Sequence, residues 1–185
     1  LSLYESKSGE RGIFNREAAK NIVKQNGRRD PDYEFGTNPC SEIILRPFQF
    51  CNLTEIIVRA DDTIKDVQRK ARIASILGTI QSTLTHFPYL RKIWRDNTEA
   101  ERLLGVSMTG VLDNALLNNA DDPELEGRLQ SIKQVAIDVN KEFAEAFGIP
   151  QSAAVTCNKP SGTVSQLTDT ASGIHARHAA YYYRR

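Results

Sequence analysis

The sequence predicts an α/β fold, and three observations support this prediction. Phe50 to Val58 is nearly continuous in apolar and β-branched residues, which is typical of a buried strand. Two long segments, beginning near Thr63 and Asp121, carry apolar residues at helical spacing. Short strand-like runs follow them, at Leu104 to Gly110 and at Ala153 to Cys157. Strands and helices therefore alternate along most of the chain.

The first third of the chain is expected to be irregular apart from one helix and short strands. Leu1 to Tyr4 has a strand-like pattern, and a loop with two glycines follows it. A helix is predicted from about Glu17 to Gln25, because Asn15 is a good N-cap and Asn26-Gly27 is a typical C-terminal stop. Ile43 to Leu45 is predicted to be a strand.

The two long helices have recognisable ends. Thr63 and Asp66 fit a capping box, and Pro88 is expected to stop the first long helix. Its predicted buried stripe is Ile64, Val67, Ala71, Ala74, Leu77, Ile80 and Leu84. A short helix is expected around Trp94, another from Val111 to Leu117, and the second long helix is expected to end at Phe147-Gly148. Its predicted inward residues are Ile132, Val135, Ala136, Val139, Phe143 and Phe147.

Composition excludes several classes of protein. The chain has 185 residues, with 24 basic and 23 acidic side chains and a formal net charge of +1, so neither a nucleic acid nor a membrane surface is an expected partner. No apolar run approaches the ~18 residues of a membrane span. Three cysteines without a secretory signal favour a reducing cytoplasm. We predict no metal site.

Both ends of the sequence fall in strand-like runs. The chain starts at Leu1 without a methionine and stops after Tyr181-Tyr182-Tyr183-Arg184-Arg185. We therefore expect an internal slice of a longer polypeptide, whose sheet has open edges.

The loop from Gly36 to Glu42 concentrates three kinds of reactive side chain. It carries Asn38, Cys40 and Glu42, and Pro39 stiffens it. A thiol, an amide and a carboxylate at one tip suit a reaction centre in which the thiol reacts and the carboxylate moves a proton. Ordinary turn chemistry with a packed cysteine explains the same residues, so the pattern alone leaves both readings open.

A second candidate site follows the last predicted strand. Pro160 is expected to begin a helix, and the turn supplies small hydroxyl residues and a glycine that turn backbone N–H groups toward an anion. The residues proposed to bind phosphate are Ser161, Gly162, Thr163 and Ser165. A plain helix cap is the alternative, and the spacing is not that of a P-loop.

Several motifs together resemble the catalytic chain of ribonucleotide reductases. Asn38-Pro39-Cys40-Ser41-Glu42-Ile43, followed by Cys51-Asn52-Leu53, is similar to the finger loop of that family. Pro160 to Ser165 is similar to its substrate-phosphate turn. Ser8 to Arg16 is similar to its specificity loop, which conveys the identity of the effector nucleotide to the substrate base, so Gly9, Glu10, Arg11 and Gly12 are expected to serve in this loop. Segments Leu103 to Asp113 and Gly173 to His178 also resemble family segments, although we expect structural roles for them.

The resemblance implies part of a ten-stranded α/β barrel with the finger loop threaded through its centre. The chain, residues 1–185, then forms an internal part of one catalytic domain. Residues 1–35 hold the specificity loop and a helix, and residues 36–58 hold the finger loop and strands. Residues 59–150 are mainly helical, and residues 151–185 hold the phosphate turn and a following strand.

The resemblance also implies a radical mechanism. Cys40 becomes a thiyl radical that removes the 3′ hydrogen of a ribonucleotide, Glu42 accepts the 3′ hydroxyl proton, and Asn38 hydrogen-bonds the ribose hydroxyls. Cys51 and a partner cysteine supply two reducing equivalents and become a disulfide. In the family this partner lies on an early strand, upstream of the segment that this chain resembles, and Cys157 is expected to be a packing residue at a strand end.

The spacing of eleven residues between Cys40 and Cys51 resembles that in the adenosylcobalamin-dependent class of reductases. The residues of the central segment resemble those of the monomeric, triphosphate-reducing members of this class. Adenosylcobalamin is thus the implied cofactor. The implied partners are a ribonucleotide substrate, a deoxynucleotide effector and a thioredoxin-like reductant.

Three other hypotheses for the function stay open. The first is a reductase that takes its radical from a separate di-metal subunit. The second is a nucleotide-binding module without radical chemistry, which does not need Cys40. The third is a thiol hydrolase that pairs Cys40 with His175 or His178, which needs an imidazole within hydrogen-bond reach of the thiol.

Overall fold

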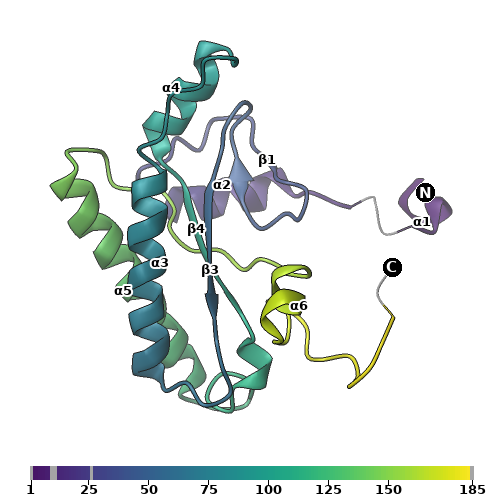
Figure 1. Ribbon diagram of the computed structural model, residues 1–185. Helices are drawn as coiled ribbons and strands as arrows, with labels where there is room; N and C mark the ends of the chain where they lie inside the picture. Colours follow the sequence, from purple (N-terminus) through teal and green to yellow (C-terminus); the bar gives the residue numbers. More distant parts are fainter. Residues whose placement is uncertain (1, 9–11, 26, 184–185) are drawn as a thin grey trace.

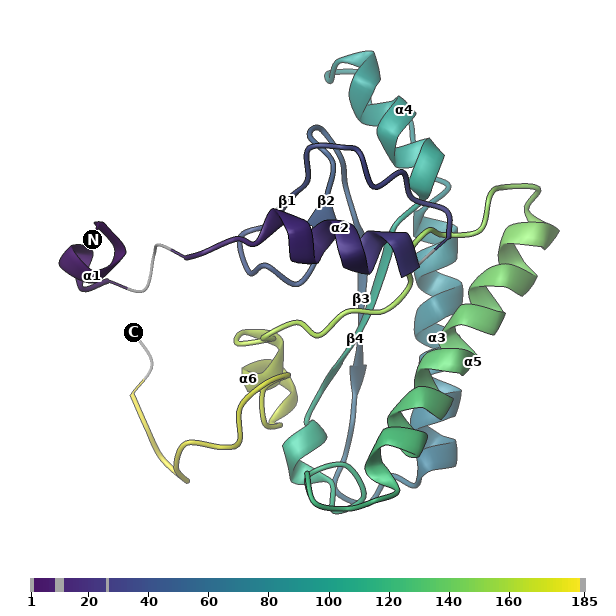
Figure 2. The same cartoon turned by 180° about the vertical axis from the view of Figure 1, so that it is seen from behind.

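A computed structural model describes residues 2–8, 12–25 and 27–183, and its framework is a parallel sheet covered by helices on one face (Figure 1). Strands β3 (Asn52–Ile57) and β4 (Leu104–Thr109) pair in parallel, from Asn52 opposite Leu104 to Ile57 opposite Thr109. Helices α3 (Ile64–Gln81) and α5 (Leu125–Ala146) lie side by side along this pair, as the view from behind also shows (Figure 2). The predicted α/β class is confirmed.

The remaining elements are short. They are α1 (Ser2–Ser6), α2 (Arg16–Gln25), β1 (Gly36–Thr37), β2 (Ile44–Leu45), α4 (Lys92–Glu101), the 3-10 turn η1 (Val111–Asp113) and α6 (Val164–Thr168). None of the helices described here is both long enough and apolar enough to cross a bilayer.

The local start signals of two helices work as the sequence predicts. The Asn15 side chain accepts a hydrogen bond from the N–H of Ala18 at 3.0 Å, which caps α2. Thr63 and Asp66 form a reciprocal capping box at the start of α3. Helix α3 nevertheless ends at Gln81, well before Pro88. At this earlier end, the hydroxyl of Ser82 donates a hydrogen bond to the carbonyl of Thr79, and that of Thr83 donates one to the carbonyl of Ile80.

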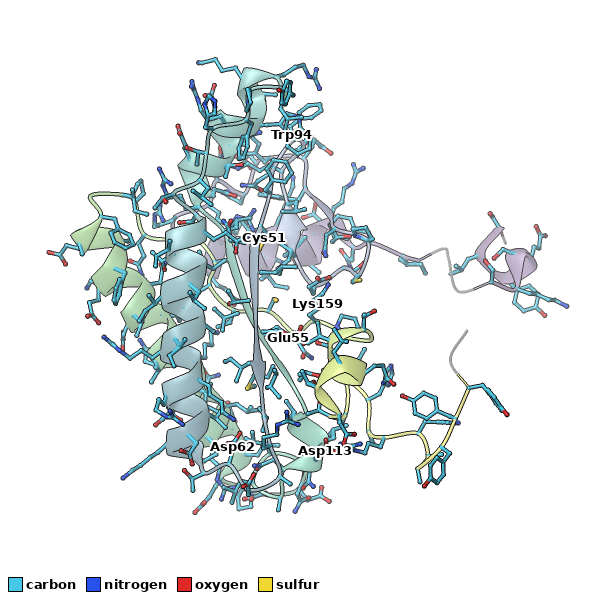
Figure 3. The ribbon with its side chains drawn as sticks, viewed as in Figure 1. Cys51, Glu55, Asp62, Trp94, Asp113 and Lys159 are labelled. Carbon is cyan, nitrogen blue, oxygen red and sulfur yellow. The ribbon has the colours of Figure 1, made fainter. Side chains whose placement is uncertain are left out.

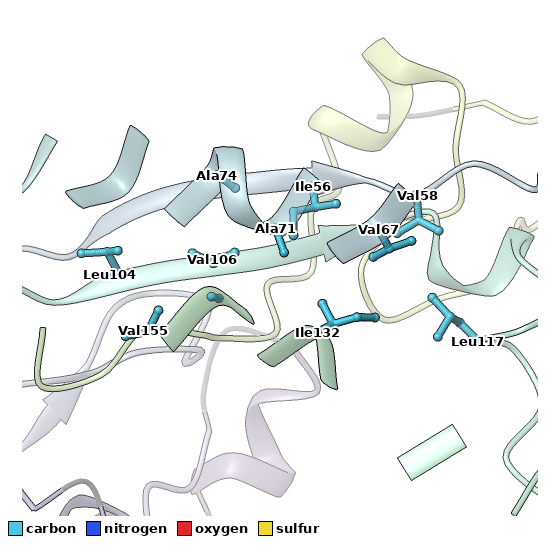
Figure 4. Packing of buried hydrophobic residues seen from close by; sticks show 11 residues of the cluster. Ile56, Val58, Val67, Ala71, Ala74, Leu104, Val106, Leu117, Ile132 and Val155 are labelled. Carbon is cyan, nitrogen blue, oxygen red and sulfur yellow. The ribbon is translucent and has the colours of Figure 1, made fainter. Parts of the chain in front are cut away.

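The main hydrophobic core lies between the sheet and the helix pair α3 and α5 (Figure 4). Its members come from β3, β4, both helices and the segment after α5. They are Ile56, Val58, Val67, Ala71, Ala74, Leu104, Val106, Leu117, Ile132, Ala136 and Val155. Full burial of each large aliphatic side chain contributes about 1.5–3 kcal/mol, so this layer is the chief stabilising unit.

The buried face of α3 is rotated from the predicted stripe. Leu77, Ile80 and Leu84 are 56%, 44% and 69% exposed, whereas Ser75, Gly78 and Thr79 are buried. A Cβ added at Gly78 would lie 3.1 Å from the Leu104 side chain, which shows how closely the helix approaches β4. Close approach selects small residues for the inner face and turns the larger ones outward. Phe147, predicted to face inward from α5, is likewise 42% exposed.

Several predicted strands and helices are wrong. Ser2 to Tyr4 belongs to α1, and residues 169–183 contain no strand, so neither terminal run pairs with a sheet. Residues 111–117 form only the 3-10 turn η1 and further turns. Residues 153–157 run beside β4 with a single parallel bridge, from Thr156 to Val106. Strand propensity needs a neighbouring strand to become a ladder, and the described chain supplies none beside the described parts of the two terminal runs.

A buried carboxylate joins the N-terminal third of the chain to α4. Glu101 is fully buried and forms ion pairs with Arg29 and Arg46, at 2.9 and 2.8 Å. Gln49 is the third partner and donates a hydrogen bond to Glu101, at 2.6 Å. These partners satisfy a charge that would otherwise be costly to bury.

Replacing Glu101 with alanine is expected to lower the free energy of unfolding by about 3–5 kcal/mol, because two buried guanidinium groups lose their counterion. Urea unfolding followed by circular dichroism measures this change. The matched control is Glu142→Ala, which removes a solvent-exposed ion pair with Arg72 on the outer surface. Equal, small effects of the two substitutions would contradict the anchoring role of Glu101.

Candidate functional site

The predicted finger loop is the turn of a small hairpin. Strands β1 and β2 pair antiparallel, with Thr37 opposite Ile44, and residues 38–43 connect them. The Asn38 side-chain oxygen accepts a hydrogen bond from the N–H of Ile43 at 3.0 Å, and its backbone carbonyl accepts one from Ser41 at 2.9 Å. Ser41 has φ +63°, so the chain reverses there. Asn38 therefore closes the loop that carries Cys40.

The polar groups of the site lie on the face of the sheet opposite α3 and α5. Side chains alternate between faces along a strand, so Cys51, Glu55 and Ser107 point away from the hydrophobic core. The chain that follows residues 153–157 crosses this same face, and the side chain of Lys159 lies there beside Glu55 (Figure 3). The N–H of Lys159 bonds to the Ser107 hydroxyl at 2.9 Å, which fixes the crossing.

Glu42 and Lys159 form the central ion pair of this face. Lys159 Nζ lies 3.0 Å from Glu42 Oε1. The Glu42 side chain is only 1% exposed, while that of Lys159 is 27% exposed. The second carboxylate oxygen, Glu42 Oε2, is buried and has no hydrogen-bond partner among the described residues. A buried, unpartnered carboxylate oxygen is rare in folded proteins and marks a place where a ligand can bind.

The surroundings of Glu42 favour its ionised form. Burial acts to raise the pKa of Glu42, but the Asn38 side chain, the Glu42 backbone N–H and Lys159 together outweigh burial and lower that pKa. The bond to Glu42 also raises the pKa of Lys159 against the effect of burial, and Cys40 and Glu55 add to this rise. Glu42 is thus held as a carboxylate at neutral pH.

Glu55 is a site residue that the sequence analysis missed. The Ser161 hydroxyl donates a short hydrogen bond to the Glu55 carboxylate. Burial raises the pKa of Glu55, and Lys159 partly offsets that rise. The available signal was a lone carboxylate within the apolar run from Phe50 to Val58. Lys159 was also missed, because only the neighbouring residues of its turn were assigned a role.

The three thiols differ sharply in their surroundings. All are unpaired, with Cys40 exposed at the loop tip and Cys51 and Cys157 half-buried. Cys51 and Cys157 pack against the same small cluster, built on Ile43 and Leu103. Burial is the main cause that raises the pKa of both thiols, with Cys157 reaching about 12, and the negative charge of Glu42 raises both further. A packing contact for Cys157 agrees with its predicted role.

The phosphate turn is divided between inward and outward groups. Ser161 and Ser165 are buried, and their hydroxyls bond to Glu55 and to the carbonyl of Gly162. Gly162 and Thr163 are exposed. The predicted helix start at Pro160 is wrong, because α6 begins only at Val164 and ends at Thr168. The structure thus leaves Gly162 and Thr163, not the serine hydroxyls, facing outward.

The structure describes only part of the predicted specificity loop. Gly9, Glu10 and Arg11 lie outside the described residues. Gly12 is exposed, and a Cβ added there would meet nothing within 4 Å.

No hydrogen bond joins Cys40 to either histidine in the described part of the chain. His175 bonds through its backbone N–H to Ser172, and the His178 ring packs against Tyr182. The thiol hydrolase reading therefore receives no support from this geometry.

The difference in thiol environment predicts a difference in reactivity. Iodoacetamide at pH 8 is expected to alkylate Cys40 at least about tenfold faster than Cys51 and Cys157, because a buried thiol with a raised pKa is protonated at that pH. Peptide mass spectrometry after timed quenching measures the three rates. In Cys40→Ser the fast phase should vanish, and labelling of Cys157 at the rate of Cys40 would contradict the described burial.

A second prediction concerns how tightly the Lys159 segment is packed. A Cβ added at Gly173 would lie 1.9 Å from the Lys159 carbonyl oxygen. Gly173→Ala is therefore expected to destabilise the protein by about 1–3 kcal/mol, as overpacking does. Gly127→Ala, in α5 with open space around it, is the control and should stabilise by up to about 1 kcal/mol. Urea unfolding of both variants measures the contrast, and equal stability would show that the segment yields freely.

Comparisons with known proteins find relatives of one description along nearly the whole chain. No protein-family model matches it. An adenosylcobalamin-dependent ribonucleoside-triphosphate reductase of Lacticaseibacillus paracasei is 29% identical and aligns with 100% of this chain. Reductases with the same description from Lactobacillus helveticus and Euglena gracilis are 30% and 29% identical, over 96% and 88% of the chain. The chain spans 28%, 27% and 22% of these relatives, so it corresponds to about a quarter of their length.

The fold matches a solved structure as well. The crystal structure of a B-12 dependent (class II) ribonucleotide reductase superposes with a TM-score of 0.69, at 24% identity, over 91% of this chain and 27% of that one. The resemblance carried by the finger-loop and phosphate-turn motifs is thereby confirmed: over its whole length, the chain is similar in sequence to adenosylcobalamin-dependent ribonucleoside-triphosphate reductases, and its fold is that of part of a class II ribonucleotide reductase.

Proposed function

We propose that this chain is part of the catalytic domain of a ribonucleotide reductase that converts ribonucleoside triphosphates to 2′-deoxyribonucleotides. The observation that carries the proposal is the free, buried Glu42 Oε2, held in the same short loop as the exposed Cys40 thiol. A proton acceptor and a thiol so placed suit chemistry on one ribose ring, with both groups acting on the same carbon. The sequence relatives supply the substrate class.

The proposed reaction assigns one step to each group. Cys40, as a thiyl radical, takes the 3′ hydrogen atom, and Glu42 Oε2 accepts the proton of the 3′ hydroxyl. The 2′ hydroxyl leaves as water after taking up a proton. Cys51 and a partner cysteine give two electrons and two protons and become a disulfide. Cys40 then returns the hydrogen atom to the 3′ carbon and is again a thiyl radical, and Glu42 returns its proton to the 3′ oxygen. Asn38, which also shapes the loop, orients the ribose hydroxyls.

Adenosylcobalamin is the cofactor that we propose for the complete protein. When bound, it supplies the radical that Cys40 receives. The exposure of Cys40 fits this role, because a thiol at a loop tip is accessible to a large group approaching from outside the described residues. The chain's own part is to keep the thiol accessible while the Glu42 side chain stays buried.

Substrate phosphates are proposed to bind at the turn before α6. Gly162 and Thr163 face outward, and none of the hydrogen bonds recorded for the described residues uses the Gly162 N–H. Ser161 and Ser165 shape this turn through their internal bonds. Gly9, Glu10, Arg11 and Gly12 are proposed to carry the identity of a bound deoxynucleotide effector to the substrate base.

The complete domain is proposed to be the ten-stranded α/β barrel. Strand β3 pairs only with β4 among the described strands, so its outer edge is open. Beside this edge, Ile73 and Leu77 are exposed on α3, and they line a groove with Ile57 and Arg59. A further strand and helix of the barrel would cover both features. A thioredoxin-like reductant, a monomeric state and a cytoplasmic location complete the proposal.

The deciding experiment is a reductase assay of the full-length protein. With adenosylcobalamin, a dithiol reductant and a ribonucleoside triphosphate, it should form deoxynucleotide, and Cys40→Ser should reduce turnover by at least about 10⁴-fold because the reacting thiol is lost. The control Cys157→Ala should retain most activity. Turnover in Cys40→Ser would overturn the mechanism, and turnover that needs a metal-bearing second subunit instead of adenosylcobalamin would overturn the class.

A further inference from the structure

The role of Lys159 goes beyond the reaction steps assigned above. Its Nζ bonds to only one oxygen of Glu42, Oε1, at 3.0 Å, and leaves Oε2 without a partner. The two residues lie 117 positions apart in the sequence, one in the finger loop and one in the phosphate turn. The ion pair is therefore a direct link between the segments that handle the two ends of a nucleotide.

The backbone of Lys159 is held firmly in this position. Its N–H bonds to the Ser107 hydroxyl on β4, at 2.9 Å. Its carbonyl oxygen lies against Gly173, where no side chain would fit, and the Gly173 N–H bonds to the carbonyl of Pro160 at 3.0 Å. A lysine side chain that starts from a fixed backbone keeps its ammonium group in place with less entropic cost.

The other charged and titratable groups around the pair do not replace Lys159. Arg28, Arg29 and Lys133 line the same cavity as Glu42, but Arg29 pairs with Glu101, and the ion pair recorded for Glu42 is with Lys159. Asn38 beside Glu42 is neutral, and Cys51 and Cys157 are thiols whose anions would repel the carboxylate. Cys40 and Glu55 act on Lys159 itself, and Glu55 is bonded to Ser161. Lys159 is thus the cation that bonds directly to Glu42 among the described residues.

We propose that Lys159 is a positioning residue that keeps Glu42 ionised, occupies Oε1, and so selects Oε2 as the atom that accepts the substrate proton. This inference rests on the proposed function for the identity of the substrate, but the ionisation of Glu42 by Lys159 holds for any ligand of this site.

The test compares Lys159→Gln, which keeps a hydrogen-bond donor without the charge, with Lys159→Arg, which keeps the charge. In the full-length protein, the acid limb of the kcat–pH profile should move to higher pH by about 1 unit or more in Lys159→Gln, because the Glu42 carboxylate takes up its proton at a higher pH without the nearby cation. Lys159→Arg should return the acid limb toward its original position. The change should fall on kcat more than on KM.

A second readout does not depend on activity. Infrared difference spectra between pH values, with Glu42→Gln subtracted, follow the Glu42 carboxyl group directly. Its protonation should move to higher pH in Lys159→Gln, and circular dichroism verifies that each variant is folded. The control Lys92→Gln removes an exposed ion pair with Asp96 and should change neither readout.

The outcomes separate the two proposals. An infrared titration that is the same in Lys159→Gln and the original protein, in folded samples, overturns the role of Lys159 whether or not the protein is a reductase. A shifted titration in a protein without reductase activity supports the role of Lys159 and overturns the proposed function. If Lys159→Gln does not fold, an unshifted titration in folded Lys159→Met overturns the inference in the same way.

Discussion

The position of the hairpin formed by β1 and β2, which carries the finger loop, depends on the buried carboxylate of Glu101. A charge removed from water must be fully paired, and its partners Arg29, Arg46 and Gln49 come from either side of the hairpin. The backbone carbonyl of Glu101 also accepts a hydrogen bond from Ala153, at the start of the segment that leads to Lys159. One residue at the end of α4 thus fixes both segments that meet at the site.

Aromatic contacts reinforce this anchor. The Arg29 guanidinium lies 4.9 Å from the centre of the Phe35 ring, and that of Arg46 lies 3.9 Å from the centre of the Tyr33 ring. Each arginine is therefore held by a carboxylate and by a ring at once, which restricts its planar group to one orientation. Phe35 directly precedes β1 and Arg46 directly follows β2, so these contacts hold the hairpin at both of its ends.

The two faces of the sheet have opposite physical characters. One face packs against α3 and α5 and supplies the hydrophobic stabilisation. The other face buries Glu42 and brings Glu55 and Lys159 beside it, an arrangement that costs desolvation energy and is typical of functional sites. The stability of the first face allows the second to hold charged groups in fixed places. The alternation of side chains along β3 and β4 makes this division possible.

Local chemistry in the sequence by itself determined the α/β class, the Asn15 and Thr63 helix starts and the strands β3 and β4, because capping and periodicity act over a few residues. The sequence also predicted that the thiol, amide and carboxylate of the finger loop lie together, because they occur within a few consecutive residues. The tertiary structure alone decided the pairing of Glu42 with Lys159 and of Glu55 with Ser161, which are 117 and 106 positions apart. It also turned Leu77 and Ile80 outward on α3, since the close approach of that helix to the sheet, rather than its own periodicity, selected the face that is buried.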